Sequence, residues 1–290
     1  MPAPLTFRGA LRFALAPLFL AGCATAPLDE AGTLSSYSGL AQADGLLAKS
    51  KLRVDKEGVL AAKTVRLVPT AFSPAVKSEG ISTEQRKLVA NAVDRSLCAG
   101  LSERLKVVSG SEPADLTVHA VITNMAATDP AAVAATKAAS VAKSVLLPGV
   151  PVPTPRLPIG LGSLSIEAEA LTSRGTQEAA MVWGQGANAL SGSARISQVG
   201  DAYELAATFG NDFSQLVVTG ESPFQKLSGP PSAERVQAWA GGAPKYAACE
   251  AFGREQGVGG LFSSAVGLPP EWTDKGTGGA TAEAQPPAGQ

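Results

Sequence analysis

Few side chains in this sequence could transfer a proton or hold a metal. His119 is the only histidine of the chain, and it lies in an alternating apolar and polar segment, 115–125, that predicts a strand. Glu167 and Glu169 lie in a second such segment and would share a sheet face with His119 if the two strands pair. A zinc site needs three or four ligands, however, and a lone histidine on a polar sheet face is usually a surface residue. We therefore expect no catalytic residue, no metal site and no cofactor.

Motifs of two other reaction classes are missing from the sequence. A Ser-His-Asp triad would have to use His119, but no serine stands in a Gly-x-Ser-x-Gly nucleophile elbow. The segment Trp183-Gly-Gln-Gly-Ala-Asn188 has closely spaced glycines but lacks the lysine and the strand-to-helix context of a phosphate-binding loop. The 24 basic and 25 acidic residues leave a net charge of −1 without a run of like charge, which argues against nucleic-acid binding.

Cys23 is the residue for which the sequence predicts a definite chemical fate. Two arginines precede the apolar segment 13–21, which is too short to span a membrane as a stable helix. The segment ends in Leu20-Ala-Gly-Cys23, which looks like the lipobox of bacterial lipoproteins, where the cysteine sulfur is lipidated and the chain is cut before it. We expect residues 1–22 to be a signal peptide and Cys23 to carry lipid, so that the membrane is a partner. An ordinary secretory signal or an uncleaved helix is the alternative.

Ala24 follows the cysteine, and a residue other than aspartate there resembles the pattern of proteins sent to the outer membrane. The expected location is therefore the cell envelope, at the outer membrane facing the periplasm. In that oxidising compartment the two remaining cysteines, Cys98 and Cys249, form an even pair that could make a disulfide. Two separate buried thiols are the alternative, because spacing alone does not fix the geometry.

The elements that would position these residues form an α+β fold. We expect a tether and entry segment at 23–60, an α/β sandwich domain at 61–220, a helical extension at 221–274 and a disordered tail at 275–290. The domain should contain a mainly antiparallel sheet with two amphipathic helices on one face. The predicted strands are 64–69, 106–109, 115–125 and a hairpin of 164–171 with 178–187. The predicted helices are 82–104 and 198–218, the first opened by a capping box of Ser82 and Gln85, with further helices at 232–240 and 246–254 in the extension.

An Ala- and Pro-rich excursion, 126–161, interrupts the domain and contains a predicted helix at 130–147. A membrane hairpin is one interpretation, but the run is shorter than the roughly 20 residues needed to span a bilayer. Its two lysines, Lys137 and Lys143, also lie on nearly opposite helix faces. We favour an excursion that packs on the domain or meets a partner.

Four segments together resemble a known family. They are Leu34-Ser-Ser-Tyr-Ser-Gly-Leu40, Val65-Arg-Leu-Val-Pro69, Ile81-Ser-Thr-Glu84 and Ser165-Ile-Glu-Ala-Glu-Ala170. Over about residues 34–218 the chain is similar to the bacterial lipoproteins catalogued as domain of unknown function 3313. The resemblance implies no activity, ligand or functional residue, and it does not cover the extension after Val218.

Three functions are compatible with these observations. The first is a lipid-anchored envelope protein with a non-catalytic interaction or accessory role, in contact with an envelope protein partner. The second is a module that binds a small apolar or lipidic ligand between sheet and helices. The third is a hydrolase with an unrecognised site. The first leads, because nothing in the sequence requires chemistry.

Overall fold

The computed structural model describes residues 26–76, 80–146, 156, 158–188, 195–224, 235–237 and 240–274. The expected signal peptide, Cys23 and the tail 275–290 lie outside these residues, as do residues 147–155 and 157 of the excursion.

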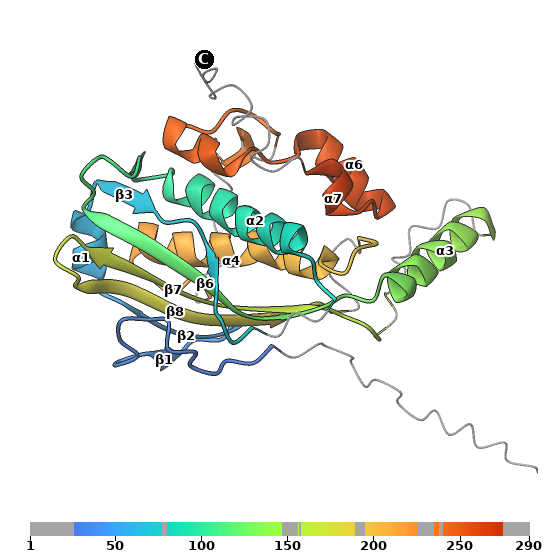
Figure 1. Ribbon diagram of the computed structural model, residues 1–290, viewed down its shortest axis with the longest axis horizontal. Coiled ribbons are helices and arrows are strands. Elements are labelled where there is room, and N and C mark those ends of the chain that lie inside the picture. The colour runs from blue at the N-terminus through green and yellow to red at the C-terminus, as the bar shows by residue number, and fades with distance from the viewer. Residues whose placement is uncertain are drawn as a thin grey trace, which may run out of the picture.

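An eight-stranded sheet forms the base of the molecule (Figure 1). The strand order is β1–β2–β8–β7–β6–β3–β5, and β4 pairs with β6. Antiparallel pairs join β1 (Ala41–Gln42), β2 (Lys49–Val54), β8 (Gln177–Gly186), β7 (Ser163–Thr172) and β6 (Leu116–Ala126). Parallel pairs involve β3 (Thr64–Leu67), β4 (Ala71–Phe72) and β5 (Lys106–Val108). The predicted mainly antiparallel sheet and the β7–β8 hairpin are therefore confirmed.

Two long helices cover one face of this sheet, as the sequence predicts (Figure 1). Helix α2 (Thr83–Leu101) begins at the predicted capping box, in which Ser82 and Gln85 bond reciprocally. Helix α4 (Gly200–Thr219) packs beside it. The two helices approach closely, since a Cβ on Gly210 would lie 2.5 Å from the Ser96 side chain. Between α4 and the sheet, Trp183, Phe209 and Phe213 are fully buried and form the aromatic centre of the core.

The second face of the sheet is also covered, which differs from the single buried face that the alternation predicts. Residues 26–40, here called the N-terminal strap, lie against the outer face of β7 and β8. Strands β1 and β2 and helix α1 (Lys56–Ala61) follow the strap directly. Residues 26–60 of the predicted tether and entry segment, 23–60, are therefore built into the fold.

The extension after α4 packs over α2 on the side away from the sheet (Figure 1). It contains η1 (Ala247–Phe252), α6 (Gly257–Val266) and α7 (Pro270–Thr273). The predicted helix at 246–254 is thus a 3₁₀ helix, and of the predicted helix at 232–240 the structure describes only 235–237 and 240.

Helix α3 (Pro130–Leu146) occupies the predicted helical part of the excursion and projects from the body (Figure 1). Among the described residues, no helix combines the length and apolar character needed to cross a bilayer.

Candidate functional site

The two carboxylates singled out in the sequence lie on the outer face of β7. Alternate side chains of a strand point to opposite faces, so Glu167 and Glu169 point away from the helices and toward the N-terminal strap. Both are buried, with exposed fractions of 0% and 6%. A buried carboxylate is costly unless several donors satisfy it, and the strap supplies those donors.

Glu167 accepts hydrogen bonds from three residues of the strap. The Ala31 N–H lies 2.8 Å from Oε1, and the Thr33 N–H lies 3.1 Å from Oε2. The Thr33 hydroxyl and the Tyr37 hydroxyl also donate to Oε2, the latter at 2.7 Å. Burial and the bond to Glu167 raise the pKa of Tyr37, which keeps its hydroxyl protonated as a donor.

Glu169, the next residue of β7 on the same sheet face, also accepts hydrogen bonds from the strap. The backbone N–H and the hydroxyl of Ser35 donate to Oε2 at 2.9 and 2.6 Å. Gln177 on β8 donates to the same oxygen at 2.7 Å and to the Ser36 carbonyl at 3.0 Å. Two of the segments that carry the family resemblance, 34–40 and 165–170, are therefore binding partners of each other.

Apolar contacts complete the attachment of the strap. Leu34 is buried against Ala180 and Val182, and Leu28, Tyr37 and Leu40 pack around them. Where the strap enters, Gly184 of β8 lets it approach closely, because a Cβ there would lie 3.1 Å from the Ala26 Cβ. The glycines of the Trp183–Asn188 segment thus belong to a strand, and Gly184 serves chain packing.

His119 pairs in register with Glu169 across β6 and β7, so the predicted neighbourhood of these residues exists. His119 is half-buried, while the two carboxylates are bonded to the strap. Among the residues that the structure describes, no cluster of three or more His, Cys, Asp or Glu side chains could hold a metal. What the arrangement does chemically is bind hydroxyl and backbone N–H donors of the chain's own N-terminal strap.

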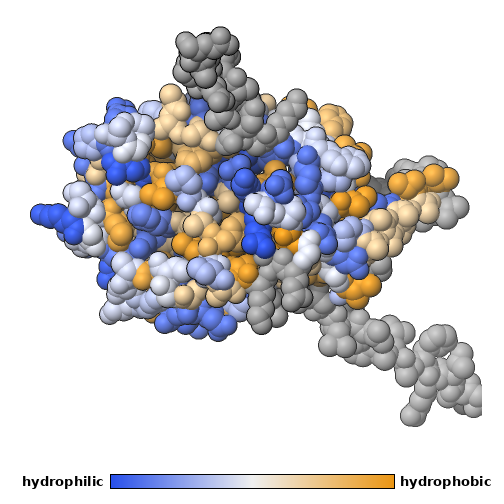
Figure 2. Space-filling model, in the orientation of Figure 1, coloured by the Kyte–Doolittle hydropathy of each residue, from blue (hydrophilic) through white to orange (hydrophobic). Residues whose placement is uncertain are grey.

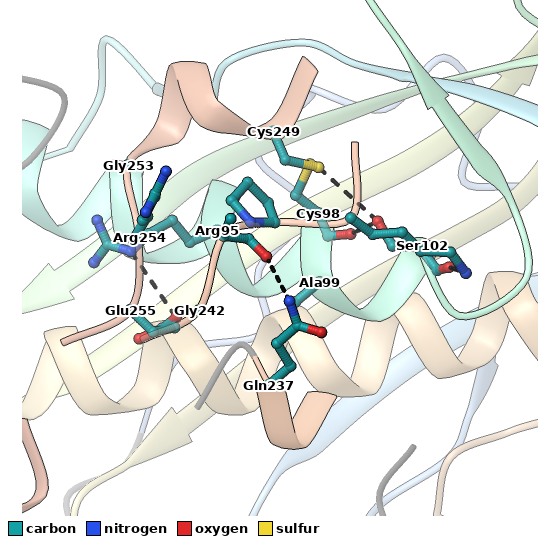
Figure 3. A pocket seen from close by; sticks show the side chains of 13 residues that line it. Arg95, Cys98, Ala99, Ser102, Gln237, Gly242, Cys249, Gly253, Arg254 and Glu255 are labelled. Carbon is teal, nitrogen blue, oxygen red and sulfur yellow. Dashed lines mark hydrogen bonds and ion pairs between the residues drawn. A yellow bond between two sulfur atoms is a disulfide. The ribbon is translucent and has the colours of Figure 1, made fainter. Parts of the chain in front are cut away.

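A second candidate site is a cavity of about 210 Å³ between α2 and the extension (Figure 3). Arg95, Cys98 and Ala99 of α2 form one wall, and Gly253, Arg254 and Glu255 of the extension form the other. Cys98 and Cys249 are joined by a disulfide with a Cα–Cα distance of 5.9 Å. The cavity lies on the far side of α2 from the sheet, not between sheet and helices, where the sequence hypothesis put a ligand.

A buried polar network beside the cavity connects the extension to both long helices, α2 and α4. The Arg95 side chain is 3% exposed and pairs with Asp274. The Tyr203 hydroxyl accepts from Arg95 at 3.0 Å and donates to Asp274 at 2.7 Å. Burial raises the pKa of Tyr203, so its hydroxyl remains a donor to Asp274. No sequence pattern indicates this network, because its members are separated by as many as 179 residues.

Two further carboxyls, the buried Asp94 and the half-buried Asp212, have raised pKa values. Desolvation raises the pKa of Asp212 to about 6, against the effect of the Trp183 indole N–H, which donates to its Oδ2 at 2.9 Å. Desolvation likewise raises the pKa of Asp94 to about 6, opposed by hydrogen bonds from Thr70. Each carboxyl accepts hydrogen bonds from one residue of a neighbouring segment, which is typical of side chains that fix packing.

Comparison with known proteins places the chain in a family. The family model described as "Protein of unknown function (DUF3313)" matches residues 29–213. Among solved structures, the chain is similar to the PelC dodecamer from Paraburkholderia phytofirmans at 9% identity and a TM-score of 0.35, covering 60% of this chain and 98% of that one. It is also similar to a DUF4136 family protein from Bacteroides thetaiotaomicron at 10% identity and a TM-score of 0.28, covering 62% and 100%. The comparison with curated proteins gave no match.

Proposed function

Since the chain belongs to the DUF3313 family of proteins of unknown function, we propose that it is a lipid-anchored cell-envelope protein with a non-catalytic interaction or accessory role. In this proposal Cys23 carries the lipid, and the protein lies at the outer membrane facing the periplasm. Its partners are the membrane and another envelope protein.

The observation that carries the proposal is the attachment of the N-terminal strap. Cys23 precedes Ala26 by three residues, and Ala26 lies against Gly184 of the sheet. Three residues of chain span at most about 11 Å, so a lipid on Cys23 would hold the folded domain directly at the bilayer. Glu167 and Glu169, whose side chains are suited to chemistry, are used to fasten this segment. These two buried carboxylates therefore hold the segment that follows the proposed lipid attachment site.

The test of the anchor compares the wild-type chain with Cys23→Ser in cells given labelled palmitate. The wild type should incorporate the label and sediment with the outer membrane, whereas the variant should do neither. A wild-type protein that is unlabelled, or that is recovered in soluble form, would overturn the proposal.

The interaction role needs a separate measurement. The lipidated protein is cross-linked in cells, captured from separated inner and outer membranes, and its adducts are identified by mass spectrometry. A protein partner that is recovered from the wild type and lost with Cys23→Ser supports the role. Recovery of no protein adduct from either membrane would contradict it.

The cavity beside the disulfide supports a second candidate, binding of a small ligand. Its wall is mainly apolar, which suits a small apolar molecule. Native mass spectrometry of the purified protein should then show a bound molecule that is absent from Ala99→Trp, which fills the cavity. A wild-type mass that equals the chain alone would exclude this candidate.

A further inference from the structure

We propose that the exposed apolar surface of α3 and α6 lies in the headgroup region of the bilayer that holds the lipid on Cys23. The proposal rests on the anchor proposed above and adds an orientation to it. The surface is called the apolar end, and its large side chains are Val141 and Val145 of α3 with Phe262 and Val266 of α6.

The first argument is the composition of α3. Among the side chains of α3 that the structure describes, every exposed one is alanine or valine. Val141 is 64% exposed and Val145 is 74% exposed. Figure 2 shows this apolar surface on the helix where it projects from the body. Soluble monomers rarely present a contiguous apolar surface of this kind without a partner for it.

Helix α6 continues the same surface. The Lys137 ammonium on α3 donates to the Ala265 carbonyl at 2.8 Å, which joins the two helices. Next to that bond, Val266 is 61% exposed, and one turn earlier Phe262 is 70% exposed. The apolar end is therefore built from two segments more than a hundred residues apart in the chain.

The second argument is the position of the anchor. Strand β6 ends at Ala126, which pairs with Ser163, and Ser163 pairs with Gly186. Helix α3 begins four residues after Ala126, so it leaves from this end of the sheet. Ala26 packs against Gly184, two residues from the same end. The turn between β7 and β8 marks the opposite end. A lipid within about 11 Å of Ala26 would thus hold the apolar end, and not the turn, near the bilayer.

The third argument is charge. The sequences of α3 and α6 contain two lysines, Lys137 and Lys143, and no acidic residue. The two helices therefore carry net positive charge, and binding at a membrane interface increases with buried apolar area and with attraction to anionic lipids. The 17 residues of α3 give a helix of about 25 Å, long enough to lie along the surface. These features favour lipid over a protein as the occupant.

The test uses the full mature chain, lipidated on Cys23, in vesicles of phosphatidylethanolamine and phosphatidylglycerol. A polarity-sensitive fluorophore is attached, without reductant, to Val141→Cys or Phe262→Cys. Ser173→Cys, exposed in the β7–β8 turn, is the matched control. Vesicles should lower iodide quenching about 5-fold at positions 141 and 262 and should leave iodide quenching at position 173 unchanged. Brominated lipid should quench the fluorophore at positions 141 and 262. The circular dichroism spectrum of each variant verifies that it is folded.

The other outcomes separate this proposal from the anchor. If the protein floats with the vesicles but all three positions stay equally accessible to iodide, the orientation is wrong and the anchor stands. If the protein does not float with the vesicles, the anchor fails and the orientation fails with it. If positions 141 and 262 are already protected without vesicles, a second copy covers the apolar end and the membrane is not its occupant.

Discussion

The side chain of Glu167 lies fully buried on a sheet face and accepts hydrogen bonds from a segment 130 or more residues away. A hydrogen bond to a charged group contributes about 1.5–3 kcal/mol, and here several converge on one carboxylate. At the scale of the residue, the carboxylates that look suited to catalysis act as acceptors that fold the strap onto the sheet.

Replacing Glu167 by glutamine tests this function. Glutamine has one acceptor oxygen and presents an amide to donors, so Glu167→Gln should lose about 2–3 kcal/mol of unfolding free energy. Urea denaturation measures the loss, and amide hydrogen exchange should quicken at residues 31–37. Glu57→Gln, at an exposed position of α1, should change stability by less than about 0.5 kcal/mol. Equal stability of both variants would mean that the strap does not depend on the carboxylate.

The raised pKa of Asp212 makes stability depend on pH. Its folded-state pKa of about 6 exceeds the ordinary aspartate pKa of 3.8, so the folded state binds more protons between these values. This carboxyl therefore supports the fold fully below about pH 4, and the support is lost as the pH rises through about 6. Asp212→Asn still accepts from Trp183 and should be more stable than the wild type by about 1–2 kcal/mol at pH 7. The difference should vanish near pH 4, and an unchanged difference from pH 4 to 7 would contradict the assignment.

At the scale of the element, the amphipathic pattern determined how much could be predicted. Helices α2 and α4 and strands β6, β7 and β8 each have a buried apolar periodicity, and the sequence located them to within a few residues. The strap has no apolar periodicity in its sequence, because its backbone N–H groups bond to carboxylates and not to a neighbouring strand. The alternation of β7 therefore predicts a polar face in contact with water, and it gives no sign that Glu167 and Glu169 attach the strap.

The disulfide is the element-scale link between α2 and the extension. It closes a loop of 151 residues, so removing it should cost a few kcal/mol by the chain-entropy model. In Cys98→Ser with Cys249→Ser, amides of 247–274 should exchange faster while those of α4 remain protected. Thiol titration of the unfolded wild type should detect no free thiol from this pair, and two free thiols would show that the bond is absent. Reductant should leave the double variant unchanged.

At the scale of the whole molecule, four layers are stacked: extension, helices, sheet and strap (Figure 1). The strap is the thinnest layer, yet it covers Ala180 and Val182, which are 0% and 1% exposed. Each side of the sheet thus depends on a covering segment, and the sheet is not an exposed surface ready for a partner.

Removing the strap should therefore change the behaviour of the whole chain in solution. A chain that starts at Ala41 exposes the apolar outer face together with two unpaired carboxylates, so it should associate or precipitate. Light scattering after size-exclusion chromatography measures the mass, and a chain that starts at Ala26 is the control. The same mass per particle for both chains would show that the outer face tolerates water.

The separation of strap and sheet along the chain also sets an order of events during synthesis. The donors at residues 31–37 leave the ribosome before their acceptors on β7, which follow 130 or more residues later in the chain. The earliest segment of the body is consequently among the last to be fixed. Until the β7–β8 hairpin exists, the N-terminal strap lacks both the sheet face and the carboxylates that hold it.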